Sequence, residues 1–387
     1  MEYIKLCEVI SSAKTERCGA SDYPVLSITK SDGVVLQSDK FKKRIASTDT
    51  EQYKLVKRGQ LVQGIHIDEA NFGIQSIVDI GIVSPAYKIW NVDFQKIVPK
   101  YLETVLRSPR SVRYYSSKFN GSVKRRERIT DSDFLAMEIP FPSKEQQQYA
   151  VDVLEKACSM TTLYQQQLQK LDELVKARFV EMFGELDKNP YGWKLLSLGA
   201  LIASCEAGWS GTGTQRKKQD GEVAVLKVSA VTKGYFIPSE CKVLDNQSNI
   251  KKYIYPQKGD LLFSRANTRE MVGATVVITE DFPEHILPDK LWKIRFVEAA
   301  NVWYMKYALS SKPIRSIFSS ISTGTSGSMY NVSMEKFKSI EIPLPPLNLQ
   351  NQFAAFVEQA DKTKVAIKKA LDETQLLFDS LMQKYFG

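Results

Sequence analysis

Residues 137–142 read MEIPFP, and residues 340–345 read IEIPLP, at an offset of 203 positions. The similarity continues to two Phe-Gly pairs at the same offset, Phe183-Gly184 and Phe386-Gly387. It also extends backwards, where Tyr101-Leu102 corresponds to Tyr304-Met305. Because the matching residues keep their order over a whole half-chain, the sequence predicts one scaffold used twice, with loops that differ between the copies.

A long helix is predicted at the end of each copy. Residues 143–183 and 347–386 contain no glycine or proline, and each run follows a proline and ends before a glycine. Apolar residues recur in both runs at steps of three and four, which is typical of a coiled-coil seam. The expected seam residues are Leu154, Ala157, Tyr164, Leu168, Leu171, Val175, Val357, Ala360, Ile367, Leu371, Phe378 and Leu381.

A helix of this length with one apolar stripe needs a partner. We expect the two helices to pair with each other, antiparallel, because two copies related by a pseudo-two-fold axis give that arrangement. Two alternatives remain at this stage: each helix folds back on its own globular part, or another protein completes the seam.

The remaining sequence predicts a mixed α/β fold with two globular parts. The expected division is a first globule at 1–143, a helix at 144–184, a second globule at 185–345 with a turn-rich linker at 185–192, and a helix at 346–387. Short β-branched runs predict strands. These runs are Val25–Ile28, Leu61–Ile65, Val223–Val228, Asp260–Phe263 and Ala274–Ile278, and short helices are expected near Pro99–Arg107 and Val302–Leu309.

The net charge of +9 is confined to the globular parts. Residues 1–143 carry +5 and residues 193–343 carry +6, whereas the two helical segments carry −1 and 0 and the linker −1. A solvated surface explains many basic clusters, but two basic globules joined by neutral helices favour a polyanionic partner. We therefore expect duplex DNA, read at two half-sites, with an affinity that falls steeply with salt.

The first globule concentrates its basic residues between Arg107 and Arg128, where eight basic residues accompany one acid. Arg107, Arg110 and Arg113 recur every third residue and would line one side of a helix. A flexible stretch from Gly121 to Arg128 follows them. Guanidinium groups of this kind suit phosphates and the guanine edge. The second globule instead has a hydroxyl-rich loop at 324–330 and basic residues after its glycine-rich stretch and after a strand.

Motifs for catalysis are absent. Asn189-Pro190-Tyr191 lacks the second proline of an adenine methyltransferase motif, Gly208–Gly213 is a weak candidate cofactor loop, and no P-loop sequence exists. Two histidines leave little for histidine chemistry, and five cysteines without a CxxC pair predict neither a disulfide scaffold nor a cysteine zinc site. No apolar run predicts a membrane span, and the first residues lack a signal-peptide layout. We expect a non-catalytic, cytoplasmic protein.

These residues resemble the specificity subunits of type I restriction–modification systems over the whole chain. The resemblance rests on the ordered, duplicated set of a globule, a proline-rich turn, a long helix ending in Phe-Gly, and a Pro-x-Gly-Trp linker. Here the turn is Pro343–Leu347 followed by Gln350, and the linker is Pro190–Trp193. The first copy departs from the pattern, because Ser143 replaces the second proline, although Glu145-Gln146 keeps an acid-glutamine pair.

The resemblance implies two target-recognition domains that read a bipartite DNA sequence, with the helices fixing the gap. It implies docking of methyltransferase subunits, which bring S-adenosylmethionine, and of restriction subunits, which use ATP and Mg, whereas this chain binds no cofactor or metal itself. We expect DNA contacts at Ser122, Lys124, Arg125, Arg126 and Arg128 in the first globule, and at Arg216, Lys217, Arg265, Asn267, Arg269, Ser326 and Tyr330 in the second.

Two rival interpretations belong to other classes. The chain could be an adenine methyltransferase or nuclease with an unrecognised site, which methyl transfer by the purified chain would show. It could also be a scaffold that docks proteins through its helices without a DNA role, which the absence of salt-sensitive DNA binding would favour.

Overall fold

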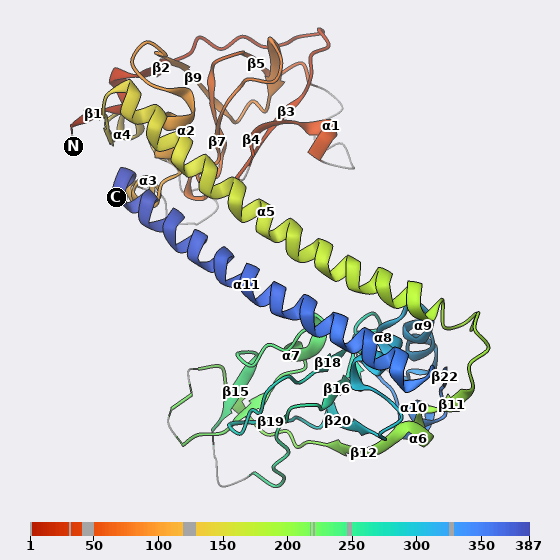
Figure 1. The fold of residues 1–387 in the computed structure, drawn as a ribbon. Helices are drawn as coiled ribbons and strands as arrows, with labels where there is room; N and C mark the ends of the chain where they lie inside the picture. The colour runs from red at the N-terminus through yellow and green to blue at the C-terminus, as the bar shows by residue number, and fades with distance from the viewer. Residues whose placement is uncertain are drawn as a thin grey trace. The chain divides into compact units, whose positions relative to one another are not determined.

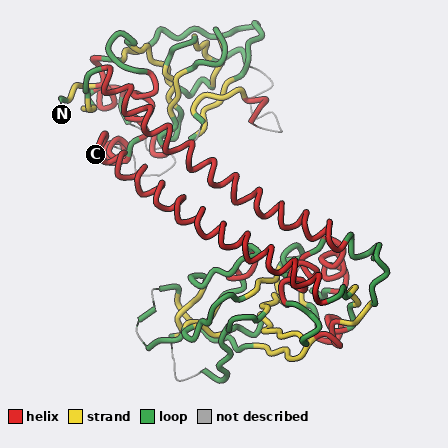
Figure 2. Tube along the Cα trace, viewed as in Figure 1, coloured by secondary structure: helices red, strands yellow, loops and turns green. Residues whose placement is uncertain are grey.

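A computed structural model describes residues 2–30, 32–40, 50–118, 129–216, 218–219, 221–245, 250–324 and 329–387. The chain divides into two compact units, the first formed by Met1–Gln165 with Lys368–Gly387 and the second by Gln166–Ile367. Each long helix therefore contributes one part to each unit. Figure 2 shows that both units combine strands with short helices, which confirms the mixed α/β prediction.

The first unit is built on a four-stranded antiparallel sheet of order β2-β9-β6-β7. Its strands are β2 (Ile10–Ser12), β9 (Lys88–Val92), β6 (Leu61–Gln63) and β7 (Phe72–Ile74). Three two-stranded pairs accompany it, formed by β1 (Tyr3–Lys5) with β10 (Glu138–Pro140), β3 (Leu26–Thr29) with β4 (Gly33–Leu36), and β5 (Lys54–Lys57) with β8 (Ile80–Val83). The helices are η1 (Leu6–Glu8), α1 (Gln37–Lys40), η2 (Ile67–Glu69), α2 (Pro99–Arg107), α3 (Pro109–Ser117), α4 (Asp131–Leu135) and the first part of α5 (Lys144–Phe183).

The second unit repeats this plan and enlarges it (Figure 1). Its corresponding sheet has the order β12-β20-β16-β18, formed by β12 (Ile202–Ala207), β20 (Leu291–Phe296), β16 (Leu261–Ser264) and β18 (Thr275–Val277). A second sheet of order β13-β15-β14-β19 consists of β13 (Gly213–Thr214), β15 (Cys241–Leu244), β14 (Ala224–Leu226) and β19 (His285–Ile286). The remaining elements are β11 (Leu195–Ser197), α6 (Leu198–Leu201), α7 (Ser229–Thr232), β17 (Ala266–Asn267), α8 (Val302–Ser310), α9 (Lys312–Ile321), β21 (Tyr330–Asn331), α10 (Met334–Lys338), β22 (Glu341–Pro343) and α11 (Leu347–Phe386).

The repeated motif of the sequence forms the same structure in both units. Strands β10 and β22 carry the Glu-Ile-Pro residues, and each pairs antiparallel with the first strand of its unit in the same register. Tyr101 Oη donates to the Pro140 carbonyl at 3.1 Å, and Tyr304 Oη donates to the Pro343 carbonyl at 2.5 Å. The tyrosines lie on α2 and α8, so this bond ties each short helix to the strand that leads into the long one.

A buried glutamine makes a second connection, between the short helix and the start of the long helix of each unit. We call the tyrosine and glutamine bonds together the joint of the unit. Gln147 Oε1 accepts from Val98 N at 2.9 Å, and its Nε2 donates to the Pro142 carbonyl at 2.9 Å. Gln350 Oε1 accepts from Asn301 N at 2.8 Å, and its Nε2 donates to the Pro345 carbonyl at 2.8 Å. Both side chains have no exposed surface. The counterpart of Gln350 is therefore Gln147, and the reading of Glu145-Gln146 as the matching pair was wrong by one residue.

The two long helices run antiparallel where they meet within each unit. In the second unit Val175, Phe179 and Phe183 of α5 share a core cluster with Phe353, Val357 and Ala360 of α11. In the first unit the first turns of α5 share a cluster with the last turns of α11. All twelve expected seam residues are buried or half-buried; Leu154, Ala157, Val175, Val357 and Ala360 are buried and the others half-buried.

The prediction of one basic helix face through Arg107, Arg110 and Arg113 was wrong. Helix α2 ends at Arg107 and α3 begins at Pro109, because the residue before a proline is disfavoured in the α conformation. Arg107 and Arg110 also make contacts inside the unit: Arg107 donates to the Phe72 carbonyl, and Arg110 donates to Tyr3 Oη at 2.8 Å. Only Arg113 of the three is exposed.

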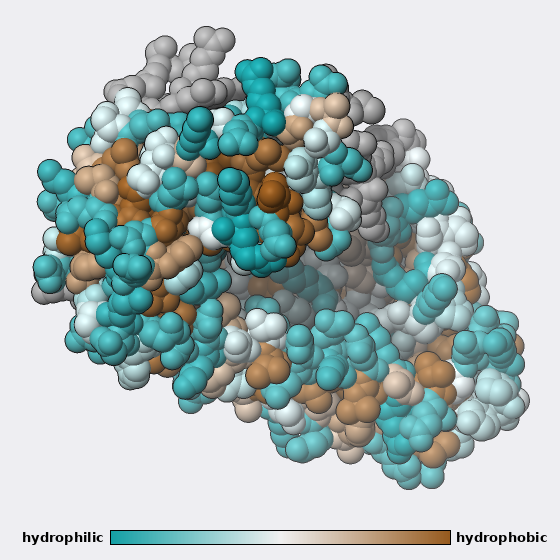
Figure 3. Space-filling view, turned by 90° about the horizontal axis from the view of Figure 1, so that it is seen from above, coloured by the Kyte–Doolittle hydropathy of each residue, from teal (hydrophilic) through white to brown (hydrophobic). Residues whose placement is uncertain are grey.

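No helix among the described residues is long and apolar enough to cross a membrane. On the face drawn in Figure 3, hydrophobic residues form small groups between hydrophilic ones.

A half-buried lysine lies on α8 of the second unit, two residues after Tyr304. Burial lowers the pKa of Lys306 on α8 to about 8, and the neighbouring cations Lys364 of α11 and Lys176 of α5 act in the same direction. The nearby carboxylates Asp361 and Asp172 oppose the shift, but both bond Lys364, at 3.2 and 2.6 Å. The Lys306 ammonium lies 4.0 Å from the centre of the Tyr307 ring.

Replacing a joint glutamine should destabilise its unit. Gln350→Ala leaves the Asn301 N–H and two carbonyls without their buried partner, so we expect a loss of about 2 kcal/mol in the free energy of unfolding. Urea unfolding followed by circular dichroism measures it. Gln352→Ala, at an exposed position of the same helix, is the control and should change stability by less than about 0.5 kcal/mol. Equal effects of the two substitutions would contradict the role given to Gln350.

Lys306 should make stability depend on pH. Its pKa is lower in the folded state than the ordinary value of 10.5, so the unfolded chain binds more protons between about pH 8 and 10.5. In that window wild-type stability should therefore rise with pH relative to Lys306→Met, while below pH 8 the difference should be constant. Unfolding of both proteins from pH 7 to 10 checks this, with the exposed Lys362→Met as control. Parallel curves for wild type and Lys306→Met would overturn it.

Candidate nucleic-acid interface

The expected DNA-contact residues fall into three groups. Ser122, Lys124, Arg125, Arg126, Arg128, Lys217 and Ser326 lie outside the described residues. Arg265, Asn267, Arg269 and Tyr330 lie close together in the second unit, around the two-stranded pair β17–β21. Arg216 lies apart from them, after β13 of the second sheet.

The loop after β16 positions the central group. Asn267 of β17 pairs in register with Tyr330 of β21, and Val332 N donates to the Arg265 carbonyl at 2.9 Å. The Arg269 guanidinium lies 5.8 Å from the centre of the Tyr330 ring, and Arg269 Nε donates to Ser319 Oγ at 3.2 Å. An arginine held over an aromatic ring in this way is pre-organised, because its planar fork keeps one orientation.

Two of the expected arginines are held by carboxylate residues. Arg265 Nε donates to the Asp289 carbonyl at 2.9 Å, with the Asp289 carboxylate 3.9 Å from its Nη2. Both nitrogens at the end of Arg216 bond Glu222, at 2.8 and 2.6 Å. The bonds from Arg216 lower the pKa of Glu222 to about 2. The fork of Arg216 thus bonds a carboxylate within the chain, and its expected contact with DNA stays a prediction.

Sequence reasoning did not find Arg315. This residue of α9 donates from Nη2 to the Glu270 carbonyl, next to Arg269, while its buried Nη1 has no hydrogen-bond partner among the described residues. Its guanidinium therefore adds a cation to the group around β17–β21. The sequence offers little signal for it, since a single arginine on an amphipathic helix is usually a solvated residue.

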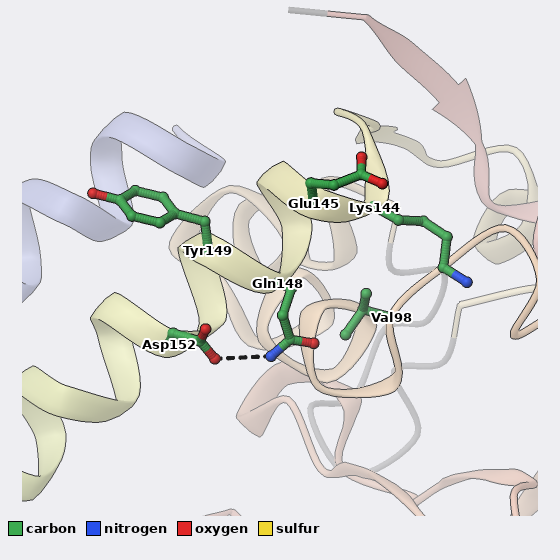
Figure 4. Close-up of a pocket in the computed structure, with 6 residues that line it drawn as sticks. All are labelled: Val98, Lys144, Glu145, Gln148, Tyr149 and Asp152. Atoms are coloured by element: carbon green, nitrogen blue, oxygen red, sulfur yellow. Dashed lines mark hydrogen bonds between the residues drawn. The ribbon is translucent and has the colours of Figure 1, made fainter.

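A shallow hollow of about 450 Å³ lies at the beginning of α5 in the first unit. Figure 4 shows Lys144, Glu145, Tyr149 and Asp152 projecting from the first turns of α5, with Gln148 Nε2 donating to the Asp152 carboxylate at 2.8 Å. Its two carboxylates outnumber its one cation, Lys144, and carboxylates repel a phosphate backbone, so this surface is a poorer site for DNA than for a protein. Among the described residues no group of three or more His, Cys, Asp or Glu side chains is arranged to hold a metal ion.

Residues 190–374 match the family model described as "Type I restriction modification DNA specificity domain". The EcoEI specificity subunit of Escherichia coli is 24% identical over 188 residues, covering 48% of this chain and 32% of that subunit. The EcoKI specificity subunit of Escherichia coli K12 is 23% identical over 279 residues, covering 67% of this chain and 59% of that subunit. The chain thus spans less than two thirds of the length of these curated relatives.

Two solved structures have the same fold over the whole chain. One, from a study of complex assembly and conformational transition of the type I R-M system, has a TM-score of 0.59 at 16% identity and covers 100% of this chain and 97% of that chain. The other, the type I restriction–modification S subunit from M. genitalium, has a TM-score of 0.57 at 13% identity and covers 100% and 96%. The fold is that of a type I S subunit. The matched DNA specificity domain covers a little under half of the chain, within the second half of the sequence.

Proposed function

We propose that this chain is the non-catalytic DNA-recognition subunit of a type I restriction–modification complex. Each target-recognition domain, at 1–143 and 185–345, binds one half of a bipartite DNA sequence, and the helices at 144–184 and 346–387 set the gap between the halves. The chain binds no cofactor of its own. Methyltransferase subunits supply S-adenosylmethionine, restriction subunits use ATP and Mg, and the complex acts in the cytoplasm.

The repeated joint supports this proposal most strongly. The matched DNA specificity domain covers only residues 190–374, but the Tyr304 and Gln350 bonds within it recur in the first unit as the Tyr101 and Gln147 bonds. The sheet order of the two units is also the same. A second specificity domain in the first half follows from this equivalence, and two domains on one chain suit a target with two half-sites.

Electrostatics supports DNA as the partner. The excess charge of +5 and +6 lies on the two globular segments. Duplex DNA attracts such surfaces by releasing counterions, which gives affinity, while differing loops give sequence preference. The acidic hollow beside Tyr149 is one surface on which a protein subunit can dock.

The first test concerns the basic stretch that follows α3. Arg126→Ala should weaken binding to a duplex that carries the full target about tenfold and should make affinity less dependent on salt, because one cationic contact is lost. Fluorescence anisotropy at several salt concentrations, with the chain alone or with its methyltransferase subunits, measures both quantities. Lys156→Ala, at an exposed position of neutral helix α5, is the control. Unchanged affinity of Arg126→Ala at moderate salt would remove this stretch from the DNA footprint.

The same binding assay separates the rival functions. Salt-sensitive, sequence-specific binding without methyl transfer by the chain alone supports the recognition subunit. Methyl transfer by the isolated chain would support an enzyme, and absence of DNA binding with and without partners would support a scaffold.

A further inference from the structure

A small hollow of about 40 Å³ opens at the end of β6 in the first unit. The residues that line it are Gln63, Gly64, Ile65, Ile67, Ala86, Lys88 and Ile129. In the sequence, Ile129 directly follows the basic stretch that ends at Arg128. In the second unit the equivalent strand, β16, leads into Arg265 and Asn267.

The carboxamide of Gln63 has a fixed orientation. Gln63 is only 4% exposed, and its Oε1 accepts from the indole Nε1 of Trp90 at 2.9 Å. Because an indole nitrogen can only donate, the acceptor must be the oxygen, and Nε2 is left as a donor. No other described residue bonds that Nε2. Gln63 therefore lines the hollow with a carboxamide whose nitrogen is an unused donor.

The other side chains that line the hollow are apolar, or their charge is neutralised by a neighbouring residue. Ile65 is 43% exposed and Ala86 is exposed, whereas Ile129 is buried. The ammonium of Lys88 is engaged by the Asp131 carboxylate. A volume of about 40 Å³ exceeds the roughly 10–15 Å³ that a water molecule needs, so the hollow can hold a methyl group with the atom beside it.

We propose that this hollow receives the major-groove edge of a thymine, with Gln63 Nε2 donating to O4 and with Ile65, Ala86 and Ile129 contacting the 5-methyl group. This inference rests on the proposed function. Thymine is the base that presents an acceptor next to a methyl group in the major groove. Cytosine presents a donor, which cannot accept from Nε2, and the bidentate pairing of a glutamine with adenine would need the oxygen that already bonds Trp90. Guanine also presents acceptors, but it has no methyl group to contact the apolar residues of the hollow.

Deoxyuridine provides the test, because it differs from thymidine only by the methyl group. The split target is first found by sequencing methylated adenines, and each thymine of the half-site read by the first domain is then replaced in turn. The full chain, alone or with methyltransferase subunits, should bind one of these duplexes about fourfold more weakly, the value expected for one buried methyl group. Replacements in the other half-site are measured in the same way.

A substitution at Ala86 tests whether the loss of affinity for the uracil duplex arises in the hollow. In Ala86→Leu the larger side chain fills the hollow from the surface. At the thymine whose replacement weakens wild-type binding, this variant should bind the thymine and uracil duplexes with equal affinity, and it should unfold like wild type. Ala20→Leu, an exposed alanine of the same unit outside the hollow, is the matched control and should keep the fourfold preference.

The outcomes distinguish this inference from the function on which it rests. The inference is overturned if the chain binds specifically but the half-site read by the first domain contains no thymine, or if no thymine replacement there lowers affinity. The proposed function still stands in both cases. A preference that persists in Ala86→Leu also overturns the inference. Absence of sequence-specific binding to the whole target by wild type contradicts the proposed function itself.

Discussion

A buried carboxamide at the start of each long helix is the interaction on which the rest of the structure depends. The oxygen of Gln147 or Gln350 accepts from a backbone N–H at the beginning of a short helix, and the nitrogen donates to the carbonyl of a proline before the long helix. An unpaired buried amide is costly, so both segments are held to one geometry. The tyrosine bonds to Pro140 and Pro343 hold the preceding strands in the same way.

This constraint explains why the copies can differ so freely elsewhere. The joint fixes how each long helix leaves its own sheet, and the loops after β6 and β16 take no part in it. The first unit has an amide donor beside apolar walls at the end of β6, while the second has Arg265 and Asn267 at the end of β16. Two chemically different surfaces on one scaffold are what a reader of two unlike half-sites requires.

Much of the fold could be predicted from local patterns. The long helices begin and end within a residue or two of the predicted positions, because runs of 40 residues without glycine or proline leave little choice. Helices α2 and α8 were likewise predicted correctly. The regular spacing of the arginines predicts one helix face, but Pro109 ends that helix. Gln147 was misplaced because three glutamines stand in a row and only the structure shows which one turns inward.

The candidate interface was less predictable, for physical reasons. The partner of Arg265 is Asp289, which lies on another loop, and the partner of Arg216 is Glu222, which lies between β13 and β14. The burial of Lys306 and the orientation of Gln63 depend on neighbours far away in sequence. Charge per segment indicated the globular parts as the interface, but which side chains remain available for a ligand depends on tertiary contacts.

The most direct test of the account changes the length of the helices. Seven residues inserted after Gln165 in α5 and after Ile367 in α11 add about 10.5 Å to each helix while nearly preserving its apolar stripe. Sequencing of methylated adenines in cells that carry this variant should show the same two half-sites with a different gap, or no methylation of the split target. Continued methylation at the original gap would contradict the claim that two domains, separated by these helices, read the two halves of one site.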